Sequence, residues 1–186
     1  MRGTAFQARA ARAVAEARGV IPASPGPDSC IFIAGHRGLA GSAIERRLRE
    51  LNYRNLVTRA RAELDLRNPV SVDAFFQEQK PEFVFLAAAT AGGIMANDLK
   101  RGDFIRDNLL IQVNVIDAAR RFGVRKLLFL GSTCIYPRDA PQPLREEYIL
   151  TGPLEPTNSA YAVAKIAGLE MIDAYRAQFG FNGISI

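Results

Sequence analysis

The chain has 186 residues, of which 48% are hydrophobic and 23% are charged. This length and apolar content are enough for one domain with a sizeable core, and they exclude a disordered chain. No stretch approaches the roughly 18 uninterrupted apolar residues of a membrane helix, so we expect no membrane partner. The net charge of +5 invites a nucleic-acid interpretation. Because the basic residues are scattered and do not alternate with aromatic ones, we expect no nucleic-acid partner.

Histidine and cysteine are too scarce for several classes of site. His36 is the one histidine, and Cys30 and Cys134 lie far apart in the sequence. These counts exclude a catalytic triad that depends on histidine, predict no metal site and provide no disulfide framework. The cysteine usage favours a cytoplasmic protein.

Residues 1–29 differ in composition from the rest of the chain. They are rich in alanine and arginine, and three prolines fall between Pro22 and Asp28. An arginine-rich, acid-poor leader is typical of organellar transit peptides. The alternative, which we favour, is a flexible extension or a start codon placed too early. We therefore expect a flexible leader over residues 1–29 and a folded domain over residues 30–186.

From residue 30 onward, strand and helix patterns alternate. Short apolar runs predict strands over residues 30–34, 55–58, 83–87, 127–130 and 184–186. Helical spacing of apolar residues predicts helices over residues 42–51, 69–80, 104–122 and 159–179, and Gly123 is placed to end the third. This alternation predicts a doubly wound, Rossmann-like α/β domain with a parallel sheet covered on both faces.

Apolar spacing also predicts which helix faces are buried. The expected inward residues are Ile44, Leu48 and Leu51 in the first helix, Val72, Phe75 and Phe76 in the second, and Ile105, Leu109, Val113, Ile116 and Ala119 in the third. The sequence ends three residues into the fifth expected strand. Buried parallel strands normally run further, so we expect the chain to be incomplete at its C-terminus.

A glycine-rich turn follows the first expected strand. Gly35, Gly38 and Gly41 have the spacing G-x-x-G-x-x-G between a buried strand and a helix. Glycine permits the tight turn and lets backbone N–H groups approach a pyrophosphate, while the helix N-terminus adds a favourable dipole. This context predicts a dinucleotide-binding loop that includes His36, Arg37 and Leu39. An ordinary turn is the alternative, and His36 is interpreted as structural more readily than as catalytic.

The end of the second expected strand indicates which dinucleotide is bound. Arg59 and Arg61 follow it, and no acidic residue stands at the strand tip. An acidic residue there binds the ribose of NAD, whereas arginine accommodates the 2′-phosphate of NADP. With Arg37 placed to close on the same phosphate, the sequence predicts NADP(H); solvated loop arginines are the alternative. Asp65 is placed for a contact to the adenine edge.

Tyr161 and Lys165 form a Y-x-x-x-K pair on one face of an expected helix. A lysine ammonium stabilises a phenolate, so the tyrosine can exchange a proton near neutral pH. Ser132 follows the fourth expected strand, at a carboxyl end where such sheets bind ligands, and is placed to hydrogen-bond a substrate carbonyl. The alternative for the pair is an exposed helix pair without chemistry.

Together, these motifs resemble the extended short-chain dehydrogenase/reductase family, whose members act on nucleotide sugars. The similarity spreads over residues 30–186 and is carried by residues 33–43, 86–89, 92–94, 127–137 and 154–168. The Cys-Ile-Tyr-Pro block at residues 134–137 is most similar to the branch that epimerises and reduces GDP-4-keto-6-deoxymannose. A cysteine at that position is not expected in simple sugar 4-epimerases.

The resemblance implies roles for the residues that match its motifs. NADPH would deliver a hydride to C4 of a GDP-linked keto sugar, while Tyr161 donates the proton and Lys165 and Ser132 assist. Cys134 would be an acid/base group in epimerisation at C3 and C5, and a small core cysteine is the alternative. Implied cofactor contacts also include Ala87, Ala88, Ala89, Asn108, Tyr161 and Lys165, and Lys165 can hold the nicotinamide ribose. Asn108 is equally interpretable as a satisfied polar group.

The sequence departs from this family's pattern in two ways. The family pairs the cysteine with a histidine further along the chain and adds a C-terminal lobe that grips the GDP-sugar, and neither is found in these 186 residues. The resemblance also implies a homodimer through the helices at 104–122 and 159–179. Two alternatives stay open, which are another nucleotide-sugar epimerase or reductase and an inactive NADP-binding fragment.

Overall fold

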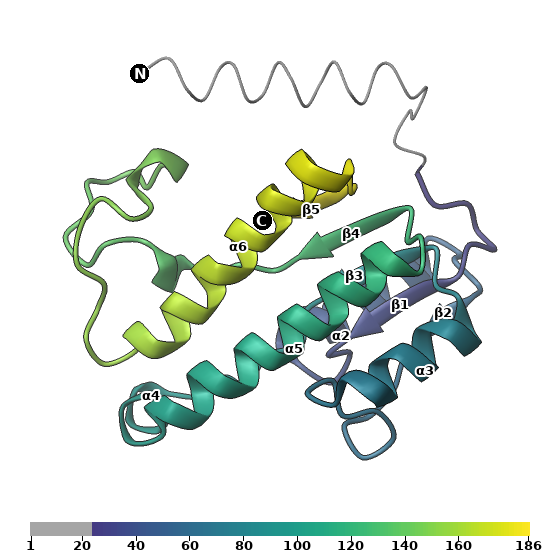
Figure 1. Ribbon diagram of the computed structural model, residues 1–186, viewed down its shortest axis with the longest axis horizontal. Helices are drawn as coiled ribbons and strands as arrows, with labels where there is room; N and C mark the ends of the chain where they lie inside the picture. Colours follow the sequence, from purple (N-terminus) through teal and green to yellow (C-terminus); the bar gives the residue numbers. More distant parts are fainter. Residues whose placement is uncertain (1–23) are drawn as a thin grey trace.

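The computed structural model describes residues 24–186, whose elements are shown in Figure 1. Five parallel strands form one sheet in the order β2-β1-β3-β4-β5. The strands are β1 (Ile31–Ala34), β2 (Leu56–Val57), β3 (Phe83–Leu86), β4 (Lys126–Phe129) and β5 (Gly183–Ser185). The predicted Rossmann-like α/β fold is confirmed.

The four expected helices are present. They are α2 (Leu39–Glu50), α3 (Pro69–Gln79), α5 (Arg101–Arg121) and α6 (Ser159–Phe179). The sequence did not predict the short α4 (Ile94–Leu99) or the 3₁₀ turns η1 (Thr133–Ile135) and η2 (Glu146–Tyr148). Both α2 and α5 begin earlier than expected, because their first turns are exposed and contain glycine, which hides the apolar spacing. Within residues 24–186, no helix combines the length and hydropathy needed to cross a membrane.

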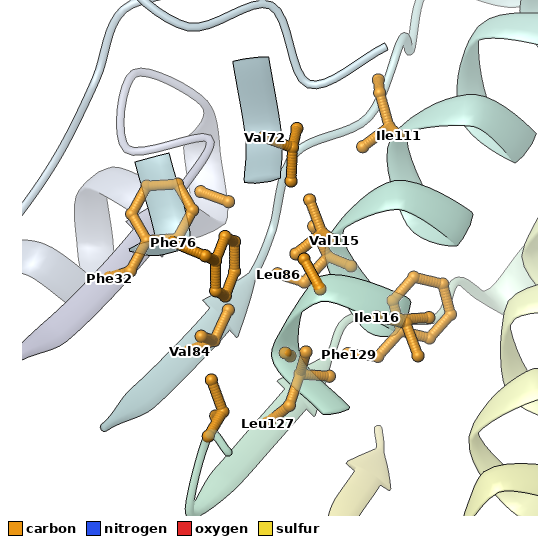
Figure 2. Packing of buried hydrophobic residues seen from close by; sticks show 14 of the residues in the cluster. Phe32, Val72, Phe76, Val84, Leu86, Ile111, Val115, Ile116, Leu127 and Phe129 are labelled. Atoms are coloured by element: carbon orange, nitrogen blue, oxygen red, sulfur yellow. The ribbon is translucent and has the colours of Figure 1, made fainter. Parts of the chain in front are cut away.

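Helices cover both faces of the sheet, but unequally. On one face, α3, α5 and α6 pack over a large cluster around Phe32, Val84 and Phe129 (Figure 2). On the other face, α2 packs over a smaller cluster that contains Ile31 and Ile33. Neighbouring residues of β1 belong to different clusters because successive side chains of a strand point to opposite faces. The predicted inward residues of α3 are all buried.

Two predicted buried residues are exposed in the structure. Leu51 is 49% exposed because it lies at the C-cap of α2, beyond the apolar stripe. Val113 is 45% exposed, while Phe104, Ile111 and Val115 of α5 are buried. Because α5 packs against both the sheet and α6, it buries residues on a wider part of its surface. The spacing of its apolar residues alone does not predict which residues these are.

The predicted leader falls largely outside the described residues, but residues 24–29 are described. Asp28 accepts two hydrogen bonds from Arg54, at 2.8 and 2.7 Å, and the hydroxyl of Tyr53 donates to the carbonyl of Pro25 at 3.3 Å. Backbone N–H of Arg54 also donates to the carbonyl of Pro27 at 2.8 Å. These contacts attach residues 25–28 to the domain.

Close packing of α5 against α6 depends on one glycine. A Cβ atom at Gly168 would lie 2.6 Å from the ring of Phe129 and 2.9 Å from the amide oxygen of Gln112. Gln112 is buried and donates a hydrogen bond to the carbonyl of Ala164, across the two helices. Glycine at position 168 therefore lets α6 approach both the sheet and α5 (Figure 1).

We expect Gly168→Ala to lower the free energy of unfolding by about 1–3 kcal/mol, because an added methyl group overpacks this contact. Gly102→Ala in α5 is the matched control, since a Cβ atom there meets nothing within 4 Å. Better helix propensity predicts a gain of up to about 1 kcal/mol for the control. Urea unfolding of the two variants measures both values, and equal stabilities would contradict the packing argument.

Candidate active site

The glycine loop brings three backbone segments into direct contact. Gly35 has a φ of +91°, and a Cβ atom there would lie 2.6 Å from the backbone nitrogen of Ala88. A Cβ atom at Gly41 would lie 2.1 Å from the carbonyl oxygen of Gly35. Only glycine fits at either position, so the end of β1, the start of α2 and the segment after β3 meet without side chains between them.

A cavity of about 290 Å³ opens above this contact. Its walls come from the glycine loop, the segment after β2 and the segment after β3. It is lined by nine of the predicted cofactor-binding residues, namely Gly35, His36, Arg37, Gly38, Arg59, Asp65, Ala87, Ala88 and Ala89. Its position at the carboxyl ends of β1 and β3 is the usual place for a ligand in a parallel sheet.

The cavity has the features that a phosphate-bearing dinucleotide needs. The N–H groups in the first turn of α2 have no acceptor within the helix and carry its positive dipole end. Nδ1 of His36 is buried without a hydrogen-bond partner among residues 24–186. Leu64, Leu66 and Ile111 add an apolar wall. Donors beside an apolar wall fit the phosphate and ring portions of such a group.

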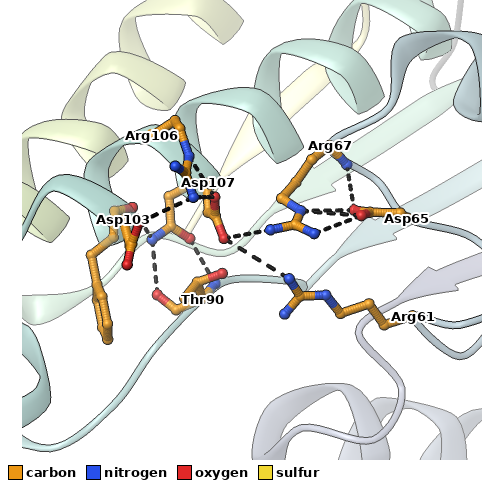
Figure 3. Close-up of polar contacts among 9 residues, drawn as sticks. Arg61, Asp65, Arg67, Thr90, Asp103, Arg106 and Asp107 are labelled. Carbon is orange, nitrogen blue, oxygen red and sulfur yellow. Dashed lines mark hydrogen bonds and ion pairs between the residues drawn. The ribbon is translucent and has the colours of Figure 1, made fainter. Parts of the chain in front are cut away.

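The arginines around the cavity differ in their partners. Arg67 is neutralised, because it holds both carboxylate oxygens of Asp65 and donates to Asp107 at 2.9 Å (Figure 3). Its hydrogen bond lowers the pKa of Asp65 to about 2, so this carboxylate is ionised throughout the neutral range. Asp65 therefore orients Arg67. The predicted contact of Asp65 to adenine would compete with this ion pair.

Three other arginines are more available to a ligand. The guanidinium of Arg61 is 4.0 Å from Asp107 and its side chain is 66% exposed. Arg59 donates to the carbonyl of Thr58 at 2.9 Å and lies 5.6 Å from the ring of Phe75. Neither Arg59 nor Arg37 has an ion pair with the described acidic residues. The cavity rim thus keeps a net positive charge.

Some predicted cofactor residues do not line the cavity. The side chain of Leu39 is 96% exposed, so only its backbone N–H, in the first turn of α2, is suited to a phosphate. Gly41 serves the close packing of α2. Asn108 is 2% exposed, donates to the carbonyls of Thr90 and Phe104, and accepts from the N–H of Thr90. This saturated amide favours the structural alternative, because it holds the segment after β3 against α5.

A second cavity, of about 360 Å³, lies next along the segment after β3. It is lined by Ala91, Gly92, Gly93, Ile94, Asn97, Cys134, Asn158 and Tyr161. The Oδ1 atoms of both asparagines are buried and have no hydrogen-bond partner among residues 24–186. Two unpartnered acceptors beside a thiol and a phenol fit a ligand that carries hydroxyl groups.

Tyr161 and Lys165 both lie on α6, four residues apart. Burial raises the pKa of Tyr161, and the nearby Ser132 hydroxyl opposes this effect, so the phenol holds its proton at neutral pH. Lys165 is 3% exposed, and its Nζ lies 5.9 Å from the centre of the Tyr161 ring. Nζ donates to the carbonyl of Leu130 at 2.6 Å. Burial lowers the pKa of Lys165 to about 8.

Cys134 lies in η1, directly after β4, and is half-buried. Its backbone N–H donates to the hydroxyl oxygen of Ser132 at 3.3 Å. Nδ2 of Asn158 donates to Sγ of Cys134 at 3.2 Å. Sequence reasoning missed Asn158; the available signal was an asparagine at a helix start that follows a proline and a threonine.

The chain is similar to several known proteins. The model of the NAD dependent epimerase/dehydratase family matches residues 31–186. A protein of Oryza sativa subsp. japonica named "Probable GDP-L-fucose synthase 1" is 60% identical over 156 residues, which are 83% of this chain and 48% of that protein. GDP-L-fucose synthase of Escherichia coli strain K12 is 50% identical over 150 residues, or 81% and 47% of the two chains.

A solved structure is similar over the same region. It is a GDP-D-glycero-L-gluco-heptose synthase from Campylobacter jejuni, determined in the presence of NADPH. It aligns with a TM-score of 0.85 at 45% identity, over 88% of this chain and 48% of that chain. The chain spans about half the length of the curated relatives it matches.

The buried lysine allows a test that needs no ligand. We expect Lys165→Met to raise the free energy of unfolding at pH 7 by about 3 kcal/mol, because a pKa of about 8 in place of 10.5 means that the folded state disfavours the charge. Between pH 8 and 10.5 the unfolded chain binds more protons, so the stability of the unmodified chain rises with pH. The advantage of methionine is therefore full below pH 8 and vanishes above 10.5.

Urea unfolding at several pH values between 7 and 11 measures this trend. Lys100→Met is the control, because it removes an exposed lysine in place of a buried one. A Lys165→Met variant that is less stable than the unmodified chain at pH 7 would show that the ammonium stabilises the fold.

Proposed function

Because the chain belongs to the NAD dependent epimerase/dehydratase family, we propose that it binds NADPH and converts GDP-4-keto-6-deoxymannose to GDP-L-fucose by epimerisation and reduction. The observation that carries the proposal is the second cavity, in which a thiol and a phenol line the same space. The relatives named GDP-L-fucose synthase support this choice of substrate. The chain spans about half the length of those relatives.

NADPH is the proposed cofactor because the rim of the first cavity is positively charged. Arg37, Arg59 and Arg61 surround the place where a 2′-phosphate would lie, and no acidic residue ends β2. The synthase from Campylobacter jejuni was solved with NADPH present, which supports the same choice. When bound, the nicotinamide supplies a hydride to the carbonyl carbon at C4 of the sugar.

In the reduction, Tyr161 supplies the proton. Its raised pKa keeps the phenol protonated until the C4 oxygen gains negative charge. The O–H bond of Tyr161 then breaks as the new O–H bond forms on the sugar. Lys165 remains largely protonated at pH 7, and its positive charge stabilises the phenolate that is left. The hydroxyl of Ser132 donates a hydrogen bond to the same sugar oxygen.

In the epimerisation, Cys134 is the proposed base. The ketone acidifies the neighbouring C–H bonds, so a thiolate can take the proton while the electron pair moves into the enolate. An S–H bond forms and a C–H bond breaks in this step. A second acid has to return a proton from the opposite face of the sugar. The resemblance assigns this role to a histidine that is not among these 186 residues.

We also propose that the chain forms a homodimer and resides in the cytoplasm. Leu110 and Val113 of α5 and Val163 of α6 are exposed apolar residues on the two helices that lie side by side in Figure 1. A second copy would remove these side chains from water. Cys30 and Cys134 are both free thiols, which suits a reducing compartment.

The cofactor proposal predicts a preference that can be titrated. We expect NADPH to bind at least tenfold more tightly than NADH, and Arg59→Ala to weaken NADPH binding by about tenfold while NADH changes by less than about twofold. Calorimetric titration of the 186-residue chain gives the affinities. Arg54→Ala is the matched control, because Arg54 pairs with Asp28 away from the cavity. Equal affinities for NADPH and NADH would contradict the proposal.

The two chemical roles can be separated by isotope exchange. In deuterated water with GDP-4-keto-6-deoxymannose, we expect the chain to exchange hydrogen beside the ketone, and Cys134→Ser to slow this exchange at least 100-fold. One base suffices for exchange without inversion. Tyr161→Phe should retain exchange but lose NADPH oxidation. Mass spectrometry and absorbance at 340 nm give the two readouts. If Tyr161→Phe and Cys134→Ser lose both activities equally, the assignment of separate roles is wrong.

A further inference from the structure

Asn158 occupies a helix-capping position but does not cap its helix. It is the N-cap residue of α6, and its side chain makes no capping hydrogen bond. Asn68 holds the same position in α3, and its Oδ1 accepts from the N–H groups of Val70 and Ser71 at 3.0 and 3.2 Å. Asparagine is among the best N-cap residues. The same residue type at an equivalent position therefore serves a different purpose at the start of α6.

The amide of Asn158 is directed at Cys134 instead. Nδ2 donates to Sγ at 3.2 Å, while Oδ1 is buried and has no partner among residues 24–186. A buried acceptor without a partner costs stability. The amide of Asn158 therefore neither caps its helix nor satisfies its own oxygen. We explain its placement by the cavity that Asn158 and Cys134 both line.

Backbone contacts fix both partners of this hydrogen bond. On one side, the N–H of Asn158 donates to the carbonyl of Glu155 at 3.2 Å, and its own carbonyl accepts from Ala162 at 3.0 Å. On the other side, the N–H of Cys134 is held by the Ser132 hydroxyl. The amide and the sulfur therefore face one another from two rigid segments, the first turn of α6 and η1.

We propose that Asn158 is a positioning residue that holds the sulfur of Cys134 and favours its thiolate form. The inference deepens the proposed function and rests on it, because the thiolate is the base in the epimerisation. A hydrogen bond to a charged acceptor is stronger than one to a neutral acceptor, so the amide stabilises the thiolate more than the thiol. Asn158 also sits at the positive end of the α6 dipole, which acts in the same direction. Tyr161 is the one other titratable side chain lining this cavity in the described chain.

The test is the alkylation rate of each cysteine, which requires neither substrate nor cofactor. Only the thiolate reacts with iodoacetamide, and mass spectrometry of the 186-residue chain separates Cys134 from Cys30. We expect Asn158→Ala to slow alkylation of Cys134 at pH 7 by about fivefold, and Asn158→Asp by more than about tenfold, because a carboxylate repels the thiolate. Cys30 is the internal control, since its sulfur contacts the carbonyl of Gln79 and not Asn158.

The aspartate variant distinguishes an electrostatic role from a structural one. Aspartate is an excellent N-cap and favours a helix N-terminus, so α6 should be at least as stable in Asn158→Asp, as thermal unfolding would show. In both variants, the rates of Cys134 alkylation should converge with that of the unmodified chain at strongly alkaline pH, because there the thiolate forms without help from the amide.

The inference is overturned if alkylation of Cys134 changes less than about twofold in both variants, or if the slower rates persist unchanged at strongly alkaline pH. That second result would mean altered access to the sulfur. Because the assay contains no sugar, its result is independent of isotope exchange. Slower alkylation without any sugar chemistry would support the thiolate role and refute the proposed function, while exchange with unchanged alkylation would refute the role of Asn158 alone.

Discussion

The site depends on a contact between backbones at the carboxyl end of β1. Gly35 and Gly41 leave no room for a side chain, so α2 starts directly against the end of β1 and the segment after β3. The floor of the first cavity is consequently made of backbone, with the N–H groups of a helix start available to an anion. The second cavity follows along the same segment, which Asn108 ties to α5. One steric constraint thus sets the distance between the proposed cofactor site and the proposed acid/base groups.

A network of ion pairs lies beside this contact, and the arginines of the first cavity differ in whether they take part in it. Burial raises the pKa of Asp107, but hydrogen bonds from Arg106 and Arg67 outweigh it and hold that pKa below its usual range. An ionised, nearly buried carboxylate keeps Arg67 in place, and Asp65 holds the same guanidinium from the other side (Figure 3). Arg67 is therefore a fixed wall of the cavity. The arginines with weaker or no ion pairs, Arg37 and Arg59 among them, carry the charge that a phosphate would meet.

Sequence patterns predicted the parts of this arrangement that depend on local spacing. The β/α alternation, the glycine loop and the Tyr161–Lys165 pair all follow from the periodicity of strands, turns and helices, and the structure contains each of them. The patterns did not reveal that the Leu39 side chain faces solvent or that Asn108 is saturated by backbone groups. They also missed the contact of Asn158 with Cys134. Those features depend on how segments far apart in the sequence meet, and a pattern along one segment carries no information about its neighbour.

Several features that cost stability lie in or beside the second cavity. Lys165 is buried as a cation, α6 begins without a side-chain cap, and two asparagine oxygens lack partners. Other departures lie elsewhere, since α2 and α5 also begin without a side-chain cap and Nδ1 of His36 is buried without a partner among residues 24–186. Folded proteins tend to retain such costs where chemistry requires them. Lys165 lies beside the phenol, and Asn158 contacts the thiol, so each cost accompanies one of the two groups that would move protons. The local instability and the proposed chemistry therefore have the same origin, which is the need to hold ionisable groups in a partly dry space.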